Sequence, residues 1–141
     1  RLGMSTLRTN ALEGVDAKNS ITIVAGAGNI TTTNVQEGLV KVWCQYDAPD
    51  AAINDSFNTA SLTDGGTGDY KPNYTNVLSN TNYGITIGQK SLFATTAIVS
   101  FYAESDSLKT TALCNISSFK TGDGSNQDPG EVSLAIHGDL A

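Results

Sequence analysis

Residues 54–74 have the sequence NDSFNTASLTDGGTGDYKPNY, and this stretch decides the fold. A glycine-rich turn, residues 63–68, separates two polar segments that suit strands, because glycine adopts the positive φ values that tight turns require. Apolar and aromatic residues stand on both sides of the turn: Phe57, Leu62, Tyr70 and Tyr74. The stretch predicts strand, turn and strand, with Phe57 and Leu62 pointing inward.

The pattern continues through the rest of the chain from Gly38 onward. Strands are expected over 39–46, 53–58, 69–75, 83–88, 95–103, 109–119 and 132–137. About seven short strands with turn signals every 8–12 residues or so are typical of an antiparallel β-sandwich or a small barrel. We therefore predict an all-β domain of one of these two kinds over residues 37–141.

The core of this domain is expected on one face of each strand. The predicted core residues are Val40, Val42, Cys44, Tyr46, Phe57, Leu62, Ile85, Ile87, Ala97, Val99, Phe101, Leu113, Cys114, Ile116, Val132, Leu134 and Ile136. Trp43 falls on the face opposite Cys44, so it either closes the edge of the core or faces a partner.

Residues 1–36 differ from the rest because their apolar residues come in short bursts separated by Gly14, Gly26 and Gly28. The alternation in Ser20-Ile21-Thr22-Ile23 suits one short strand. A ribbon of two or three such strands is marginal by itself. We expect an extended N-terminal attachment or oligomerisation segment, covered by the second domain or by another copy of the chain.

Charge and length limit the classes of function. The net charge is -6 over 141 residues, and the eight Lys and Arg residues are scattered, which argues against a nucleic-acid partner. No stretch approaches the ~18 consecutive apolar residues of a membrane span, so no membrane insertion is expected. Cys44 and Cys114 lie in apolar segments and are either buried free thiols or a disulfide between two strands.

Catalytic, metal and cofactor motifs are missing from the sequence. His137 is the single histidine, which leaves no His-based metal cage. The loop that contains Asp123 and Asp128 departs from the spacing of a dedicated calcium loop. Nothing in the spacing of the other carboxylates singles out an acid and a base. We expect a protein that is not an enzyme, with no catalytic residues, metal or cofactor.

Tyrosines offer the one candidate binding chemistry. Tyr70, Tyr74 and Tyr83 have amphipathic rings that suit stacking on a sugar face, and they are the candidate glycan contacts. At strand period, tyrosines also fill a half-buried sheet face, which is the structural alternative.

The 54–74 stretch, continuing through Leu78-Ser79-Asn80-Thr81-Asn82-Tyr83, resembles a segment common in tailed-bacteriophage virion proteins. There it follows a strand of the kind matched here by Lys41-Val42-Trp43-Cys44-Gln45-Tyr46. The opening, Met4 to Leu12, is similar to the starts of fibre-like proteins of marine and cyanobacterial phages. Pro72 departs from the commoner residue and suggests an edge or a bulge.

The resemblance implies a tail-fibre, spike or head-appendage subunit located in the virion, usually homotrimeric, with an N-terminal attachment part and a C-terminal β domain. It identifies no catalytic residues. The expected function is a non-enzymatic structural subunit of a phage particle, either a trimeric fibre or spike or a capsid decoration protein, which contacts other virion proteins. The alternative is a glycan-binding module that recognises the host cell surface.

Overall fold

The computed structural model describes residues 9, 11, 22–24, 32–34, 38–91, 98–102 and 109–141. The chain forms two compact units, Arg1–Gly38 and Leu39–Ala141. In the first unit, β1 (Thr22–Val24) pairs antiparallel with β2 (Thr32–Asn34), with Ile23 opposite Thr33. Each strand has three residues, so the two together form a minimal ribbon.

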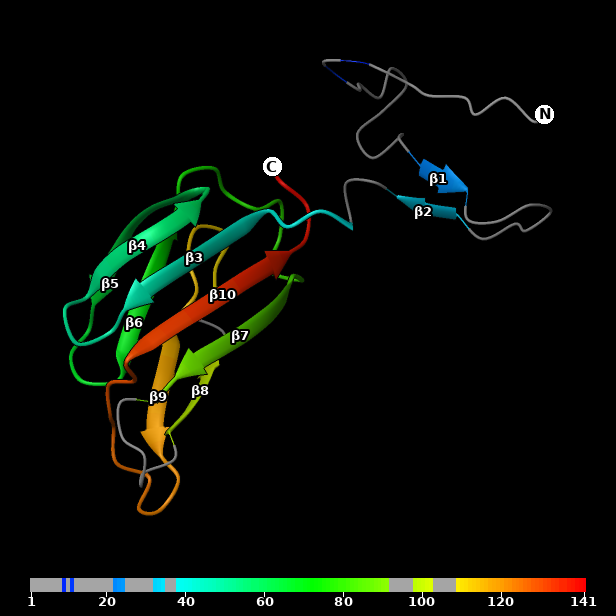
Figure 1. Ribbon diagram of the computed structural model, residues 1–141. Coiled ribbons are helices and arrows are strands. Elements are labelled where there is room, and N and C mark those ends of the chain that lie inside the picture. Colours follow the sequence, from blue (N-terminus) through cyan, green and yellow to red (C-terminus); the bar gives the residue numbers. More distant parts are fainter. Residues whose placement is uncertain are drawn as a thin grey trace, which may run out of the picture. The chain divides into compact units, whose positions relative to one another are not determined.

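The second unit contains two four-stranded antiparallel sheets (Figure 1). The first sheet has the order β4-β3-β10-β7, formed by β3 (Val42–Asp47), β4 (Ala52–Phe57), β7 (Gly84–Lys90) and β10 (Glu131–His137). The second has the order β5-β6-β9-β8, formed by β5 (Thr59–Asp64), β6 (Asp69–Tyr74), β8 (Ile98–Tyr102) and β9 (Ile116–Lys120). The predicted all-β sandwich is confirmed, and the sheets do not close into a barrel.

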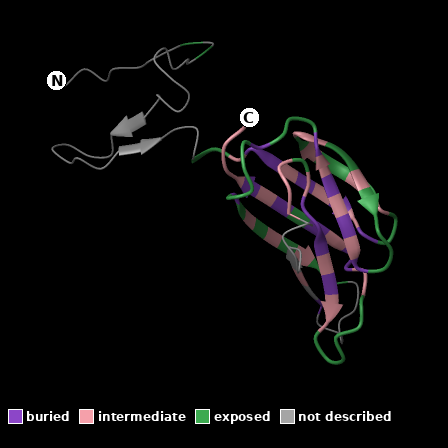
Figure 2. Cartoon of the chain, turned by 180° about the vertical axis from the view of Figure 1, so that it is seen from behind, coloured by how far each residue is buried: buried purple, intermediate pink, exposed green. Residues whose placement is uncertain are grey.

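Strict alternation along the central strands places the core between the sheets (Figure 2). Val42, Cys44 and Tyr46 of β3 are buried, whereas the residues between them are partly exposed. β10 pairs with β3 on one side and β7 on the other, so the first and last strands of the unit meet at the centre of a sheet. The buried core residues are Val42, Cys44, Tyr46, Ala48, Tyr70, Tyr74, Leu78, Tyr83, Cys114, Ile116, Val132, Leu134 and Ile136.

The chain changes sheets at a single residue, Asn58, between β4 and β5. Its φ of 56° lies in the left-handed region, which Asn tolerates better than most residues. The strand predicted over 53–58 corresponds to β4, but β5 had no counterpart in the prediction. The corner is created by one left-handed residue that has strand on both sides.

This corner also explains a wrong core prediction. Phe57 was expected inside, yet it lies opposite Trp43 on the outer face of the first sheet, with 52% of its surface exposed. Leu62 is half-buried and packs against the core. Because Phe57 and Leu62 belong to different sheets, their sequence spacing does not place them on one face.

The strand predicted over 109–119 is shorter than expected and begins at Ile116. Before it, Thr110 forms a turn in which its Oγ1 accepts hydrogen bonds from the N–H groups of Ala112 and Leu113, each at 3.2 Å. Such side-chain bonds compete with the strand ladder. The predicted core positions Ala97, Val99 and Phe101 lie outside the side chains that the structure describes.

Pro72 is buried within β6, between β5 and β9 in the sheet order. On one side Pro72 is opposite Leu62 of β5, and on the other side the ladder to β9 contains only Asp69 and Tyr70 of β6, so Pro72 lies beyond that ladder. A residue without an N–H group fits here because no ladder bond to β9 is needed at this position.

Candidate functional site

The three tyrosines proposed as glycan contacts are core residues. Tyr70 is 2% exposed, Tyr74 6% and Tyr83 4%. A ring must present an open face to stack on a sugar, and these rings are enclosed between the sheets. The prediction of Tyr70, Tyr74 and Tyr83 as glycan contacts is therefore corrected to the structural alternative, tyrosines that fill a sheet face.

Tyr70 connects three loops at one end of the sandwich. Its hydroxyl lies 2.6 Å from the carbonyl oxygen of Ala48 and 2.7 Å from Oδ1 of Asp128. The same carboxylate oxygen accepts a hydrogen bond of 2.6 Å from the N–H of Gly68. Burial, followed by the bond to Asp128, raises the pKa of Tyr70 above its ordinary value. The hydroxyl is thus a donor that holds loops together.

Tyr74 and Tyr83 form a second pair inside the sandwich. Their rings meet edge to face with centroids 6.4 Å apart, and the Tyr74 hydroxyl donates to the Tyr83 hydroxyl at 3.3 Å. Lys109 places its Nζ 4.5 Å from the Tyr83 ring centroid and donates to the Tyr83 carbonyl oxygen at 2.9 Å. Burial raises the pKa of Tyr83 to about 12. These contacts stabilise the 109–114 turn against the core.

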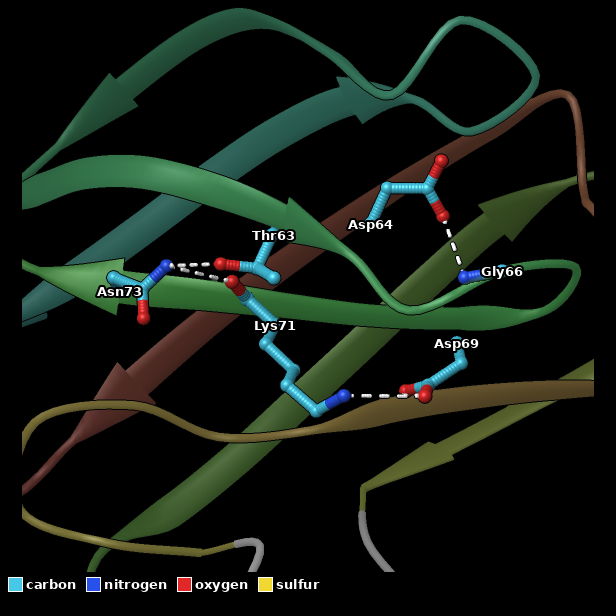
Figure 3. A network of polar contacts seen from close by, with 6 residues as sticks. All are labelled: Thr63, Asp64, Gly66, Asp69, Lys71 and Asn73. Atoms are coloured by element: carbon cyan, nitrogen blue, oxygen red, sulfur yellow. Dashed lines mark hydrogen bonds and ion pairs between the residues drawn. The ribbon is translucent and has the colours of Figure 1, made fainter.

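The clearest polar surface is the exposed side of the β5–β6 hairpin (Figure 3). The Asn73 side-chain amide of β6 donates to Thr63 Oγ1 at 2.9 Å and to Ser61 Oγ at 3.1 Å on β5. Lys71 Nζ lies 3.1 Å from Asp69 Oδ2, and both side chains are partly exposed. A surface ion pair of this kind contributes between zero and about 1 kcal/mol.

The hairpin turn is organised by its own carboxylate. Asp64 Oδ1 accepts a hydrogen bond of 2.7 Å from the N–H of Gly66, as Figure 3 shows. Gly66 and Gly68 both have positive φ, at 107° and 72°. The glycine run thus forms a tight, self-bonded turn at 65–68, which confirms a turn within the predicted 63–68, although Thr63 and Asp64 belong to β5. Asp64 and Asp69 thus bond to groups of the hairpin itself, Gly66 and Lys71, as is typical of aspartates near turns.

The remaining candidate groups, His137 and Asp55, lie on strands of the first sheet, whereas the hairpin belongs to the second sheet. His137 ends β10, opposite Gly84 of β7, and is half-buried. Asp55 lies on β4, an edge strand of the first sheet. Asp64 and Asp69 belong to β5 and β6 of the second sheet. Among the residues that the structure describes, no three His, Cys, Asp or Glu side chains are grouped so that they could hold a metal ion.

The two cysteines are free and buried, which is the first of the two predicted states. Burial raises the pKa of the Cys44 thiol and of the Cys114 thiol to about 11 each. Since the thiolate is the reactive form, both groups are inert in the folded state at neutral pH. They behave as small apolar side chains of the core.

Comparison with known proteins adds no relative. No family model matches the chain, no curated protein matches it, and no solved structure matches it. Within the described part of the chain, no helix is long and apolar enough to cross a membrane.

Proposed function

We propose that the chain is a non-enzymatic structural subunit of a phage particle, exposed on the virion as a trimeric fibre or spike or as a capsid decoration protein. The observation that carries the proposal is the 54–83 segment, whose sequence resembles a segment of tailed-phage virion proteins. In the fold this segment spans most of β4, all of β5 and β6, and the corner at Asn58. The resemblance thus falls on the part of the chain that joins the two sheets.

The division of the chain supports the same proposal. Unit Arg1–Gly38 is small, and its strands β1 and β2 have three residues each. A two-stranded ribbon is marginal in water unless further strands or a covering element complete it. A virion attachment segment meets that need, because neighbouring proteins or other copies of the chain supply the cover.

The polar side chains of the sandwich are consistent with a structural role. Asp128 holds Gly68 and Tyr70, and Asn73 connects β6 to β5. Each group has its hydrogen bonds within the fold, where it orders a loop or a hairpin. A stable, exposed scaffold requires this kind of local ordering.

The test is the location and copy number of the chain in purified particles, measured by quantitative mass spectrometry against the major capsid protein. We expect the chain in particles, at a high copy number for a decoration protein and a low one for a fibre. Labelling with antibody fragments in electron micrographs then separates head from tail. Absence of the chain from intact, infectious particles would overturn the proposal.

A glycan-binding host-recognition module is the second candidate. With the tyrosines buried, the surface that supports it is the partly exposed side of the β5–β6 hairpin, where the Asn73 amide orders the Ser61 and Thr63 hydroxyls beside the Lys71–Asp69 pair. Such groups hydrogen-bond sugar hydroxyls. A glycan array tests it: binding that Asn73→Ala abolishes, and that the core variant Tyr74→Phe leaves unchanged, supports this surface. An array without hits overturns it.

A further inference from the structure

The outer face of the first sheet carries two aromatic side chains on neighbouring strands. Trp43 of β3 lies directly opposite Phe57 of β4 in the antiparallel ladder. Phe57 is 52% exposed and Trp43 is partly exposed. The neighbours of Trp43 in the chain, Val42 and Cys44, are buried in the core. Because side chains alternate between the two faces of a strand, both rings belong to the face that points away from the second sheet.

The register extends this pair into a row across all four strands of the sheet (Figure 1). Trp43 is also opposite Ala135 of β10, and Ala135 is opposite Thr86 of β7. We call Phe57, Trp43, Ala135 and Thr86 the aromatic row. Ala135 and Thr86 have smaller side chains than the two aromatic residues, so a ligand that stacks on the rings can lie close to β10 and β7.

A second row, two residues further along β3, is polar. Gln45 lies opposite Asp55 of β4 and opposite Ser133 of β10, and Ser133 is in turn opposite a glycine of β7, Gly88. We call these four residues the polar row. The Gln45 side-chain amide donates to Glu131 Oε1 at 2.7 Å, which orders it. Residues two apart in a strand are separated by about 7 Å, so amide, carboxylate and hydroxyl groups stand directly beside the aromatic row.

No contact within the described part of the chain explains why residue 88 is glycine. A Cβ on Gly88 would meet no atom within 4 Å, and its φ is not positive. Gly84, on the same face of β7, is almost as open, since the nearest atom to a Cβ there is the His137 carbonyl oxygen at 4.0 Å. Glycine inside a strand weakens it and often marks a place where a ligand approaches the backbone closely. Gly88 therefore supports a ligand that lies low over β7.

The charges of this face limit the kind of ligand. Its titratable residues are Asp47, Asp55, Lys90, Glu131 and His137. Lys90 is exposed and lies opposite Glu131, whereas Lys41, directly before β3, is 7% exposed and donates to the Leu39 carbonyl oxygen at 3.3 Å. Three carboxylates against one exposed ammonium group repel phosphate, sulfate and carboxylate groups. An anionic ligand is therefore disfavoured.

The composition of the two rows also disfavours a protein partner. Neither row contains Leu, Ile, Val or Met. The centre of a protein contact is rich in apolar side chains and depleted of charged ones, whereas Asp55 lies in the polar row and Glu131 is bonded to it. A neutral sugar fits better, because its C–H face stacks on an aromatic ring while its hydroxyl groups bond amide, carboxylate and hydroxyl groups.

We propose that the outer face of the first sheet binds a neutral oligosaccharide, with the aromatic row stacking on sugar rings and the polar row hydrogen-bonding their hydroxyl groups. The site does not depend on the virion role. It also lies on the other sheet from the β5–β6 hairpin, so it is separate from the surface described above for a glycan-binding module.

The test applies the full chain to an array of neutral gluco-, manno- and galacto-oligosaccharides together with sulfated and uronic-acid glycans. We expect binding to at least one neutral series and to none of the anionic glycans. The bound oligosaccharide is then titrated against the protein while the fluorescence of Trp43, the single tryptophan, is followed. Its emission should shift to shorter wavelength, because a stacked sugar excludes water from the ring.

Two variants test the two halves of the site. Phe57→Ala should raise the dissociation constant about tenfold, a loss typical of an aromatic residue at the centre of a contact. Gly88→Val should also weaken binding about tenfold, because its side chain occupies the place of the ligand. The fold should tolerate this valine, since a Cβ at that position meets no atom and valine favours strands. The urea midpoint of Gly88→Val should therefore not fall.

Val77→Ala is the matched control, because Val77 is an exposed apolar residue that belongs to neither row, and it should bind like the unmodified chain. An array without a neutral hit, binding to anionic glycans alone, or undiminished binding by Gly88→Val would overturn the site. Trp43 emission that shifts on dilution without any glycan would show that another copy of the chain covers this face, and would overturn the site as well.

The outcomes separate this site from the other proposals. Binding that Asn73→Ala abolishes and Gly88→Val leaves unchanged places the glycan on the hairpin and overturns the site on the first sheet. A chain that binds a neutral oligosaccharide through the two rows but is absent from particles overturns the virion role and leaves this site standing.

Discussion

Asn58 and Asn76 are joined by three hydrogen bonds at the corner between the two sheets. Asn58 Oδ1 accepts hydrogen bonds from the backbone N–H and from the side-chain amide of Asn76, at 2.7 Å and 3.0 Å. The Asn58 amide in turn donates to the Asn76 carbonyl oxygen at 3.1 Å. One side chain thereby fixes the end of β4, the start of β5 and the segment after β6.

Replacing Asn58 should therefore destabilise the whole sandwich. Asn58→Ala removes these bonds and leaves a residue with a Cβ at positive φ, for an expected loss of about 3 kcal/mol in the free energy of unfolding. Asn58→Gly removes the same bonds without the backbone strain and should lose about 2 kcal/mol. Urea denaturation measures both. Equal losses in the two variants would contradict a role for the left-handed conformation.

The hairpin turn provides a matched pair of glycines. A Cβ on Gly68 would overlap the carbonyl oxygen of Ser118 and lie 3.1 Å from the backbone nitrogen of Gln127, whereas a Cβ on Gly66 meets nothing. Both residues have positive φ. We expect Gly66→Ala to cost about 1–2 kcal/mol from strain alone, and Gly68→Ala to cost about 3–5 kcal/mol. Thermal unfolding ranks them, and a smaller loss for Gly68→Ala would contradict the close packing of this turn on β9.

Ala51 offers a stabilising substitution. It occupies the β3–β4 turn with a φ of 49°, where a Cβ is unfavourable, and its N–H donates to the Ala48 carbonyl oxygen at 3.1 Å. Ala51→Gly keeps that bond and relieves the strain, at some cost in unfolded-state entropy. The expected net gain is about 0.5–1 kcal/mol, seen as a higher urea midpoint. Ala52→Gly, in the adjacent strand, serves as a control that should lose stability.

The Tyr70 hydroxyl and the Asp128 carboxylate form a pair suited to a double-mutant cycle. Tyr70→Phe should cost about 1–2 kcal/mol, because it removes a buried donor and keeps the ring. Asp128→Ala should cost more, since the Gly68 N–H also loses its acceptor. We expect a coupling energy of about 1 kcal/mol between the two sites. Additive losses would show that the hydroxyl bonds the Ala48 carbonyl oxygen alone.

The two buried thiols make stability fall at alkaline pH. In the unfolded chain each thiol has a pKa of about 8.5. In the folded protein burial raises the pKa of each to about 11. Between these values the unfolded state has lost its protons and the folded state has not, so the free energy of unfolding decreases as pH rises through this window. Urea midpoints at pH 8, 9.5 and 10.5 measure the decrease.

A variant without thiols separates this effect from the tyrosines. Cys44→Ala combined with Cys114→Ala should flatten the profile between pH 8.5 and about 10, where tyrosines in the unfolded chain begin to ionise. Iodoacetamide should label the native protein slowly at neutral pH and both thiols rapidly in urea. Rapid labelling of the native protein would contradict the burial of the two thiols.

Part of the fold follows from sequence pattern. Val42, Cys44 and Tyr46 fall at every second position of β3, and the structure buries these three and leaves the residues between them partly exposed. The turn within 63–68 follows from its glycines, of which Gly66 and Gly68 adopt positive φ. Alternation and turn chemistry act between near neighbours, so they can be recognised without knowing the partner strands.

The corner at Asn58 could not be recognised in this way. The left-handed φ there depends on bonds to Lys41 and Asn76, which are 17 and 18 residues away in the sequence. For the same reason the sequence predicts Phe57 in the core and leaves Tyr70, Tyr74 and Tyr83 open between a sheet face and a binding surface. A tyrosine ring has the same amphipathic chemistry whether it stacks on a sugar or packs against a second sheet. Whether the ring is buried depends on where the second sheet lies, which the local sequence does not give.

The amino-acid sequence by itself determined that this chain forms antiparallel strands with one apolar face, a tight glycine turn and a weakly apolar first quarter. These properties come from backbone preferences and side-chain alternation, which act over a few residues. Only the tertiary structure decided which strands share a sheet, that Tyr70, Tyr74 and Tyr83 fill the core, and that Phe57 lies on the outer face of the first sheet. Those outcomes depend on contacts between distant segments, whose free energy exists only once the two sheets have packed.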